Sequence, residues 1–573
     1  MRWIRKRTEP AAVAALAALA WLACACREPP PSPIAAAGNP APVRGGELHL
    51  ASFGDIKSLD PAVASDSLTD EAIQLMFAGL VDFDDQGRVV PDLAERFERS
   101  DDGLVYRFFL RPNLFFQDGS PLRAEDCKRS IERALHPDTP SSYSLFYDRI
   151  VGFDDFQSRK RDHLAGVVVE GERVLAVHLR EPDATFLPAF AMQALRPVCP
   201  SAGDRYDDAW QPCGAGPFEL ASWDKGRRLR LVRFDKWWEP GKPYLDAITY
   251  SYGMNVVTER YKLEQGDLDI DRELSLPDTF RYQNDPRWKP LGAYDGIPSI
   301  NGEEMNVEMP PFDNVEVRRA VAAAIDRDEL RLLKTSALVP LYRVLVPVLG
   351  GDDPNFPAQK YDYAAALEHM RRAGYAYDPK TGKGGWPKPI TYPVYKQGLY
   401  ELSAQVVQQQ LAKIGLRIEI KVVSYPTYLM MTKRRGTAAL APSSWAQDYP
   451  DPNDFFEPIF TTSAINDEDS NNGSFYSNPK LDDLVKRGRR ELDPKKRKAI
   501  YDEADAIVCS DAPWAMEYQY RYYGVHQPYV KGLRWSAVWP NYVRDVWLDR
   551  ASKVAMRAGV PRGLLASLAE VLR

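Results

Sequence analysis

The sequence lacks the short signatures that enzymes usually carry. It contains no G-x-S-x-G nucleophile turn, no H-E-x-x-H metal helix and no C-x-x-C pair. The six histidines are scattered along the chain without the spacing of metal ligands. Single Ser, His and Asp residues outside such patterns are usually structural. The sequence therefore predicts no enzyme, no metal site and no cofactor.

Basic clusters and long apolar runs are also scarce. The formal net charge is -6, which argues against a nucleic-acid partner. The longest apolar run, residues 11–26, has 16 residues. A membrane-spanning helix needs about 20. We also find no tandem repeat, so a repeat protein and a permanent membrane protein are both disfavoured.

The N-terminus has the composition of an export signal. Four basic residues within the first seven precede the apolar run, and small residues end it. The end of the run resembles a lipoprotein signal, in which either Cys24 or Cys26 would be acylated. A non-lipidated signal cleaved after a small residue is the alternative. We therefore expect a signal peptide over 1–23 and a location in the periplasm or cell envelope.

A proline-rich tether follows the signal. Residues 27–43 hold six prolines and no periodic apolar pattern. Such segments have polyproline character and hold a folded body away from a membrane surface. We assign 24–43 to this tether.

The body of the chain alternates predicted strands and helices. Its length of 573 residues exceeds one compact core and indicates several lobes. Alternating apolar residues indicate strands, and three-to-four spacing indicates helices. The strands are expected at 47–52, 228–234, 247–252 and 417–423, with a strand, a turn and a second strand over 105–116. The helices are expected at 69–80, 123–136, 314–333, 401–415 and 494–513. The fold class is α/β with mixed sheets.

Four cysteines lie in the body of the chain. Cys199 and Cys213 enclose a short loop rich in Gly and Asp, and export makes a disulfide possible. Four free buried thiols, with Cys127 and Cys509, are the alternative reading.

Acidic residues recur at every third position in "SSWAQDYPDPNDFF" and just after it. A metal cage or a pair of catalytic acids would explain Asp448, Asp451, Asp454 and Glu457. However, Pro450 and Pro452 prevent the helix that would align these carboxylates on one face. We expect Asp451 and Asp454 to lie in a turn and helix cap.

Several ordered stretches resemble one family. The family pattern has Asp-Gly turns, a strand that ends in Leu-Arg and a helix that starts with Ala-Glu-Asp. All of these elements occur at 101–135, in "DDGLVYRFFLRPNLFFQDGSPLRAEDCKRSIERAL". "GAGPFEL", "PPFDNVEVRRAVAAAIDRDEL" and "YSNPKLDDLV" follow in family order. Together these stretches resemble the solute-binding proteins of ABC importers in the oligopeptide and dipeptide group, solute-binding family 5. The resemblance covers residues 46 to about 548.

The resemblance implies a periplasmic-binding-protein-like type II fold. Two lobes would close on a ligand about a hinge, and a third domain would be inserted in the first lobe. Carried onto this chain, lobe I would comprise 44–80, 196–297 and 518–550, the inserted domain 81–195, and lobe II 298–517. A tail, 551–573, lies outside the resemblance.

The resemblance also implies a ligand site. Trp445-Ala446-Gln447-Asp448 matches the family's Trp-x-x-Asp, whose carboxylate pairs with a peptide's α-ammonium group. A solvated turn is the alternative for Asp448. For Tyr425, Tyr518 and Tyr520, packing in the core is the alternative to contact with the ligand. Arg343 is a guess for an arginine that would bind the carboxylate of the ligand. Further contacts are expected from Tyr425, Glu304, Tyr518, Tyr520, Tyr143 and Ser65.

The function implied is that of a monomeric, exported receptor. It would bind oligo- or dipeptides and deliver them to an ABC permease in the inner membrane, with a lipid anchor and without catalysis. Two rival functions remain open. One is a receptor of the same fold for an oligosaccharide or a metal complex, and the other is a secreted hydrolase that uses Asp448 and Asp451.

Overall fold

The computed structural model describes residues 41–549 and residue 553, with gaps in that range. The gaps are 53, 55, 65–66, 142, 204–205, 207–209, 273, 334–336, 396–399 and 539–542. The expected acylation sites, Cys24 and Cys26, lie outside the described residues, as does Ser65.

Lobe I is built on two sheets. Every second side chain along Glu47–Ser52 is buried, as expected for a strand with one face on the core. The first sheet has the order β1-β10-β9-β8 with β1 parallel to β10, and the second has the order β11-β21-β12. Their strands are β1 (Glu47–Ser52), β8 (Phe218–Asp224), β9 (Arg228–Arg233), β10 (Ala247–Tyr252), β11 (Ile270–Asp271), β12 (Gly292–Tyr294) and β21 (Tyr523–His526). The helices are α2 (Ser67–Met76), α6 (Val256–Gln265) and α7 (Leu276–Asn284), and β22 (Val530–Lys531) pairs with β23 (Trp547–Leu548).

The inserted domain has an antiparallel sheet of order β4-β5-β7-β6. Helix α3 contacts β6 and β7 of this sheet, and the stacked rings of Phe108 and Phe190 lie in its core. The strands are β2 (Val81–Phe83), β3 (Val89–Pro91), β4 (Ala94–Arg99), β5 (Val105–Leu110), β6 (Val167–Gly171) and β7 (Val174–His178). The helices are α3 (Ala124–Ala134), α4 (Phe153–Gln157) and α5 (Phe186–Phe190).

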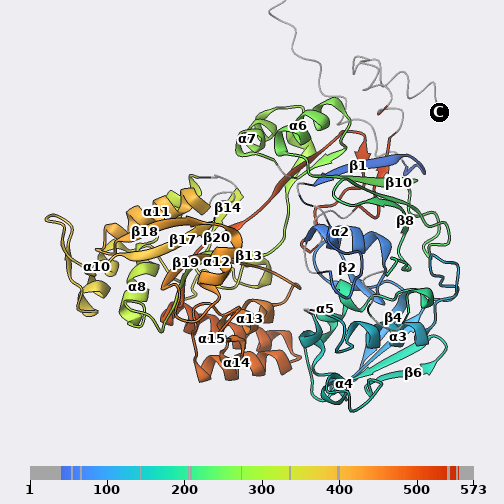
Figure 1. Cartoon of the computed structure of the whole chain (residues 1–573), viewed down its shortest axis with the longest axis horizontal. Coiled ribbons are helices and arrows are strands. Elements are labelled where there is room, and N and C mark those ends of the chain that lie inside the picture. Colours follow the sequence, from blue (N-terminus) through green and yellow to red (C-terminus); the bar gives the residue numbers. More distant parts are fainter. Residues whose placement is uncertain are drawn as a thin grey trace, which may run out of the picture. The chain divides into compact units, whose positions relative to one another are not determined.

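Lobe II carries a sheet of order β14-β20-β13-β19 and a parallel pair, β17 and β18. Strands β13 and β20 are about 200 residues apart in sequence, yet they pair antiparallel side by side (Figure 1). The strands are β13 (Ser299–Met305), β14 (Leu338–Pro340), β15 (Tyr377–Asp378), β16 (Lys383–Gly384), β17 (Ile390–Tyr395), β18 (Ile418–Val423), β19 (Leu440–Ala446) and β20 (Trp514–Tyr520). The helices are α8 (Val315–Ala324), α9 (Arg327–Arg331), α10 (Tyr363–Arg372), α11 (Tyr400–Ala412), α12 (Tyr425–Thr432), α13 (Glu457–Phe460), α14 (Pro479–Arg490) and α15 (Pro494–Asp511).

Three expectations about the elements are corrected. The single helix expected over 314–333 is two helices, because the backbone of Asp326 is extended. The Asp326 side chain accepts hydrogen bonds from the backbone N–H groups of Asp328 and Glu329 and so caps the start of α9. The second strand expected near 111–116 is only an isolated bridge at Phe115. The lobe boundary placed at residue 518 falls inside β20, which stays in the lobe II sheet through Tyr520.

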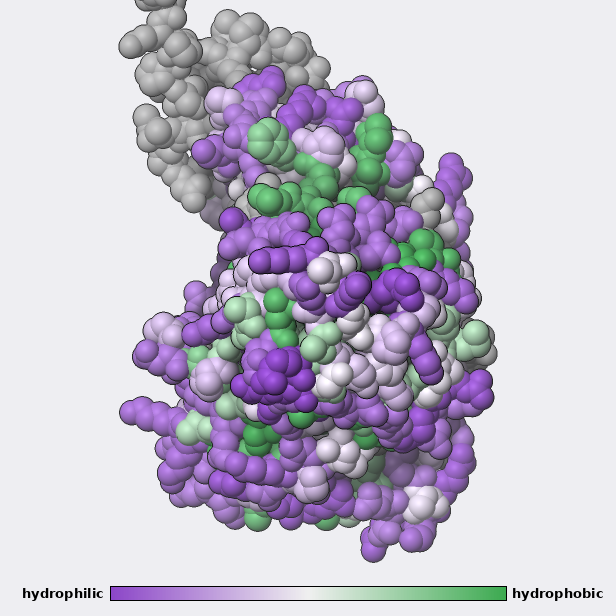
Figure 2. Space-filling model, turned by 90° about the vertical axis from the view of Figure 1, so that its left-hand side faces the viewer, coloured by the Kyte–Doolittle hydropathy of each residue, from purple (hydrophilic) through white to green (hydrophobic). Residues whose placement is uncertain are grey.

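Across the residues that the structure describes, no helix has the length and apolar character to cross a membrane. The face drawn in Figure 2 is mostly hydrophilic, and its hydrophobic residues form small separate groups.

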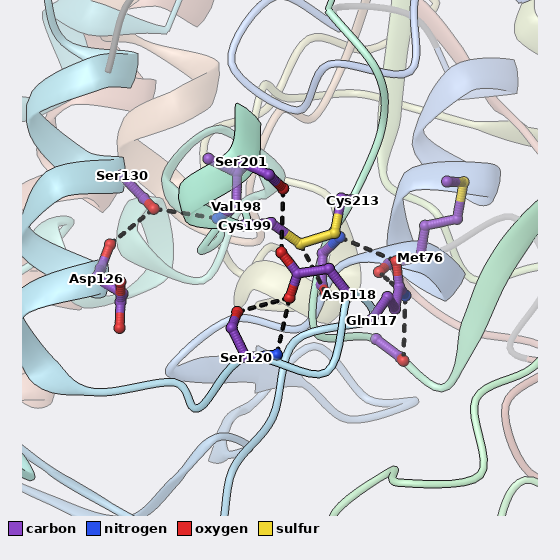
Figure 3. The surroundings of a disulfide bond; sticks show 12 residues. Met76, Gln117, Asp118, Ser120, Asp126, Ser130, Val198, Cys199, Ser201 and Cys213 are labelled. Atoms are coloured by element: carbon purple, nitrogen blue, oxygen red, sulfur yellow. Dashed lines mark hydrogen bonds between the residues drawn. A yellow bond between two sulfur atoms is a disulfide. The ribbon is translucent and has the colours of Figure 1, made fainter. Parts of the chain in front are cut away.

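A disulfide joins Cys199 and Cys213, whose Cα atoms are 5.4 Å apart (Figure 3). Asp118 lies beside it and accepts hydrogen bonds from Ser120 and Ser201. Gln117 donates to the Met76 carbonyl at 2.8 Å, which ties this region to the end of α2. Asp118 and the two sulfur atoms lie close enough to hold a metal ion. Because the sulfurs are bonded to each other, they are not thiolate ligands.

Candidate ligand-binding site

The Trp-x-x-Asp segment begins on an edge strand. Strand β19 pairs with β13 on one side, and no other strand of this four-stranded sheet pairs with its opposite side. The strand ends at Ala446. Gln447 then fixes the chain, because its backbone N–H donates to the Pro298 carbonyl at 3.1 Å and its Nε2 donates to the Ala537 carbonyl at 2.7 Å. Asp448 is therefore presented at a fixed strand end.

Asp448 is reached by solvent although protein surrounds it closely. Its side chain is classed as exposed. Burial nevertheless raises the pKa of its carboxyl group to about 6. Both observations fit a residue on the wall of a cleft, where water reaches the carboxylate but much of the bulk solvent is displaced. Such a carboxylate is ionised at neutral pH and is poorly solvated until a cation pairs with it.

Tyr143 of the inserted domain lies close enough to Asp448 for the charge of that residue to act on its hydroxyl. Its side chain is 7% exposed, and its hydroxyl accepts a 2.8 Å hydrogen bond from Gln193 Nε2. Gln193 Nε2 also donates to Asp70 at 2.8 Å. Burial, followed by the charges of Asp70 and Asp448, raises the pKa of Tyr143. The structure thus brings together Tyr143 and Asp448, which are about 300 residues apart in sequence.

Asp454 lies at this site, although the sequence predicted only a turn or cap position for it. Its Oδ2 accepts a hydrogen bond from the Asp448 backbone N–H at 2.9 Å and another from Trp445 Nε1 at 3.3 Å. The residue is 1% exposed. Burial, followed by the charge of Asp448, raises its pKa well above the usual value. The proximity of Asp454 to the motif was visible in the sequence, but the fold of the turn decides which of the acids points back.

The other acids of this stretch have different partners. Asp451 caps the short 3-10 helix Pro452–Phe455, as expected, and both of its oxygens accept from Arg497 at 2.6 and 2.7 Å. Glu457 pairs with Arg489 at 3.2 Å. Asp451, the second acid of the hydrolase alternative, is thus paired with Arg497.

Four tyrosines gather beside β19. Tyr425 begins α12 and is 51% exposed. Its ring lies 4.9 Å from Tyr395 and 6.2 Å from Tyr428, measured between ring centroids. Tyr400 packs against Tyr395 at 4.6 Å and donates to Ser444 Oγ at 3.2 Å. Of these four tyrosines, only Tyr425 was expected at the site. The high tyrosine content of "YPVYKQGLYELS" and "SYPTYL" was the sequence signal that could have predicted the others.

Two expected contacts lie in the interior instead. Glu304 is 3% exposed and accepts a hydrogen bond from Trp514 Nε1 at 3.3 Å, since this side of β13 faces the lobe II core. Tyr518 is 6% exposed, and burial raises the pKa of its hydroxyl. Tyr518 therefore packs in the core, which was the alternative to ligand contact for this residue. Tyr520 is half-buried, with its ring 4.7 Å from that of Tyr522.

Arg343 is also engaged within lobe II. Its Nε donates to Asp505 at 2.6 Å and its Nη2 to Asp502 at 2.7 Å. Phe356 stacks under the guanidinium group, 3.4 Å from the ring centroid. The guess of a carboxylate-binding arginine is therefore wrong for Arg343, because its charge is already matched.

Known proteins with this fold are binding proteins. The ABC transporter-associated periplasmic binding protein DppA of Helicobacter pylori, solved with the peptide STSA, has a TM-score of 0.73 and 24% identity, and the match covers 88% of this chain and 99% of DppA. Clavulanic acid biosynthesis oligopeptide binding protein 2 has a TM-score of 0.78 and 22% identity, covering 89% and 96%. These likenesses show the expected fold of two lobes and an inserted domain.

Sequence relatives and a family model give the family. The glutathione-binding protein GsiB of Pectobacterium atrosepticum is 26% identical over 471 residues, covering 80% of this chain and 85% of GsiB. GsiB of Salmonella typhi is 25% identical over 477 residues, covering 82% and 88%. The model of the bacterial extracellular solute-binding proteins, family 5, matches residues 88–467. Because this match spans more than half of the sequence, the chain belongs to the bacterial extracellular solute-binding proteins of family 5.

Proposed function

We propose that this solute-binding protein binds peptides outside the cytoplasm and passes them to an ABC permease, without catalysing a reaction. Asp448 would hold the α-ammonium group of the peptide. The position of Asp448 carries the proposal, since it is a solvent-reached carboxylate at the end of a strand and its pKa is raised by the protein around it. A bound ammonium group would supply the missing opposite charge.

The surroundings of Asp448 suit an extended peptide. The exposed end of β19, at Ser444 and Ala446, would offer backbone groups for strand addition, a common mode of peptide recognition. Tyr425, half-exposed in the tyrosine cluster next to this strand, would contact a ligand side chain. On the opposite side Tyr143 approaches Asp448.

The ligands of the relatives have this chemistry in common. Glutathione, named for GsiB, and the peptide STSA, bound to DppA, both carry a free α-ammonium group. A binding site organised around one carboxylate fits this shared group, while the length and side chains of the ligand would be read elsewhere in the site.

Calorimetric titration with defined peptides tests the proposal. The panel is trialanine, Ser-Thr-Ser-Ala and glutathione, each also in an N-acetylated form that lacks the charge. We expect binding of at least one free peptide and about 100-fold weaker binding of its acetylated form, since a buried charge would be left unpaired. Asp448→Asn should abolish the difference between the two forms.

Asp483→Asn is the matched control, because Asp483 is an acid of the same lobe that is 65% exposed in an i,i+4 pair with Arg487. It should bind as the unmodified protein does. If no peptide binds, the proposal fails. Native mass spectrometry of the purified protein would then show whether an oligosaccharide or a metal complex is carried instead.

We further propose that the mature chain is a monomer anchored by acylation of Cys24 or Cys26. The sequence signal and the proline-rich tether support the anchor. The intact mass of the protein from membranes should show a lipid-modified N-terminal cysteine, and light scattering should give a monomer. A mature chain that starts at another residue without lipid would refute the anchor.

A further inference from the structure

Asp454 holds together the two functional ends of the Trp-x-x-Asp segment. One oxygen, Oδ2, accepts from both the Trp445 indole and the Asp448 backbone. The turn that carries Asp454 is itself fixed, since Asp451 caps it and is held by Arg497. Asp454 therefore sets the position of Asp448 relative to Trp445 without reaching the solvent-filled side of the site.

The second oxygen of Asp454 is in a different situation. Oδ1 is buried and has no hydrogen-bond partner among the described residues. An ionised carboxylate with a bare buried oxygen is strongly disfavoured, because neither water nor a donor stabilises its charge. A proton on Oδ1 removes the charge and leaves Oδ2 free to accept both hydrogen bonds.

The charges around Asp454 act in the same direction. Asp448 lies next to it, and Asp451 is close by, although Arg497 neutralises the latter. Tyr449 packs against the same group of acids, with Glu457 beyond it. Glu457 in turn pairs with Arg489. No cation is identified at Asp454 itself within the described chain.

We propose that Asp454 is a positioning residue that keeps a proton, so that the site orients Trp445 and Asp448 while presenting one negative charge instead of two. This inference rests on the proposed binding of an ammonium group by Asp448. One carboxylate matched to one ammonium group leaves no uncompensated charge in the closed site. A second ionised acid would favour ligands with two positive charges.

The order of titration supports this assignment. Burial alone accounts for the raised pKa of Asp448, about 6, whereas the pKa of Asp454 is raised by burial and then by the charge of Asp448. Asp448 is exposed, whereas Asp454 is 1% exposed and has one buried oxygen without a partner, so Asp448 ionises first and its charge keeps the proton on Asp454. Asp448 is charged above about pH 6 and loses its charge as the pH falls through that value.

Substitution by asparagine and by alanine separates positioning from charge. Asparagine has the shape of the protonated acid, with one oxygen to accept both hydrogen bonds and an NH₂ group in place of the OH. Asp454→Asn should therefore bind the tightest peptide of the panel (trialanine, Ser-Thr-Ser-Ala or glutathione) within about threefold of the unmodified protein. Its affinity should fall with decreasing pH at the same midpoint. Asp454→Ala should weaken binding by about tenfold or more, because Asp448 and Trp445 lose their common acceptor.

Each outcome is decisive. If Asp454→Asn loses binding as severely as Asp448→Asn, or if its pH midpoint moves, Asp454 contributes charge and the inference is wrong. If Asp454→Ala does not fold, the asparagine variant alone still decides between the two. If the unmodified protein binds no peptide of the panel, it is the proposed function that fails.

Discussion

Arg133 of α3 and Asp60 of lobe I form a buried, two-pronged ion pair. Arg133 Nη2 lies 2.6 Å from Asp60 Oδ2, and Nη1 lies 3.1 Å from Oδ1. Their side chains are 1% and 3% exposed. This pair joins the inserted domain to the first lobe at a point where the two share a hydrophobic core.

Arg133→Ala should destabilise the protein by about 3–5 kcal/mol, because it leaves the buried Asp60 carboxylate without its partner. Urea denaturation followed by circular dichroism measures the change. Arg371→Ala is the control, since Arg371 is 65% exposed in its pair with Glu368. It should cost about 0–1 kcal/mol. Equal effects of the two variants would contradict this account of the pair.

Asp448 should make the empty receptor less stable at neutral pH. Its folded pKa, about 6, lies above the ordinary value for Asp, so the folded state holds the proton more tightly than the unfolded state. The stability that this provides is complete below about pH 3.9 and is lost as the pH rises through about 6. Asp448→Asn should therefore melt at a higher temperature than the unmodified protein at pH 7.5, by a margin that shrinks on acidification. A lower melting temperature at pH 7.5 would refute the expectation.

Glu303 and Glu517 predict a second pH effect, in the lobe II core. They lie on the paired strands β13 and β20 and are 1% and 3% exposed, and Glu303 accepts a hydrogen bond from the Tyr392 hydroxyl at 2.6 Å. Burial raises the pKa of Glu303 to about 7. By the same reasoning, its stabilising proton is lost as the pH rises from about 4.3 through about 7. The denaturation midpoint of Glu303→Gln relative to the unmodified protein should therefore rise between pH 5 and pH 8, and a constant difference would be inconsistent with a protonated pair.

The disulfide should contribute to stability mainly through the unfolded chain. Cys199 and Cys213 are separated by 14 positions. Closing a loop of this size is worth about 3 kcal/mol in the chain-entropy model. A reducing agent should lower the melting temperature of the unmodified protein. It should leave the Cys199→Ser, Cys213→Ser double variant unchanged, and a similar drop in that variant would contradict the assignment of the effect to this disulfide.

Local patterns were sufficient for most elements of the fold. Alternation of apolar residues identified β1, and helical spacing with acids early and bases late identified α3. Such signals are short-range and survive in any context. The break between α8 and α9 was missed because Asp326 reads as an ordinary helical residue until its side chain is seen to cap α9.

The candidate site was predictable only in part. Trp445 and Asp448 were proposed from their match to the family's Trp-x-x-Asp, and that assignment stays a prediction. Which side of a strand a residue faces depends on what packs there. For this reason the contacts of two residues were not predictable. Glu304 was expected at the ligand but is hydrogen bonded to Trp514, and Arg343 is paired with Asp505 and Asp502.

The order of residues along the chain thus determined the α/β class, the family resemblance and the acid for which a ligand is proposed. Tertiary structure alone decided which groups meet that acid, because Tyr143 and Asp454 reach it from another domain and from across a turn. Burial and neighbouring charge then decide which carboxylate is ionised, and both are properties of packing that a sequence pattern does not contain.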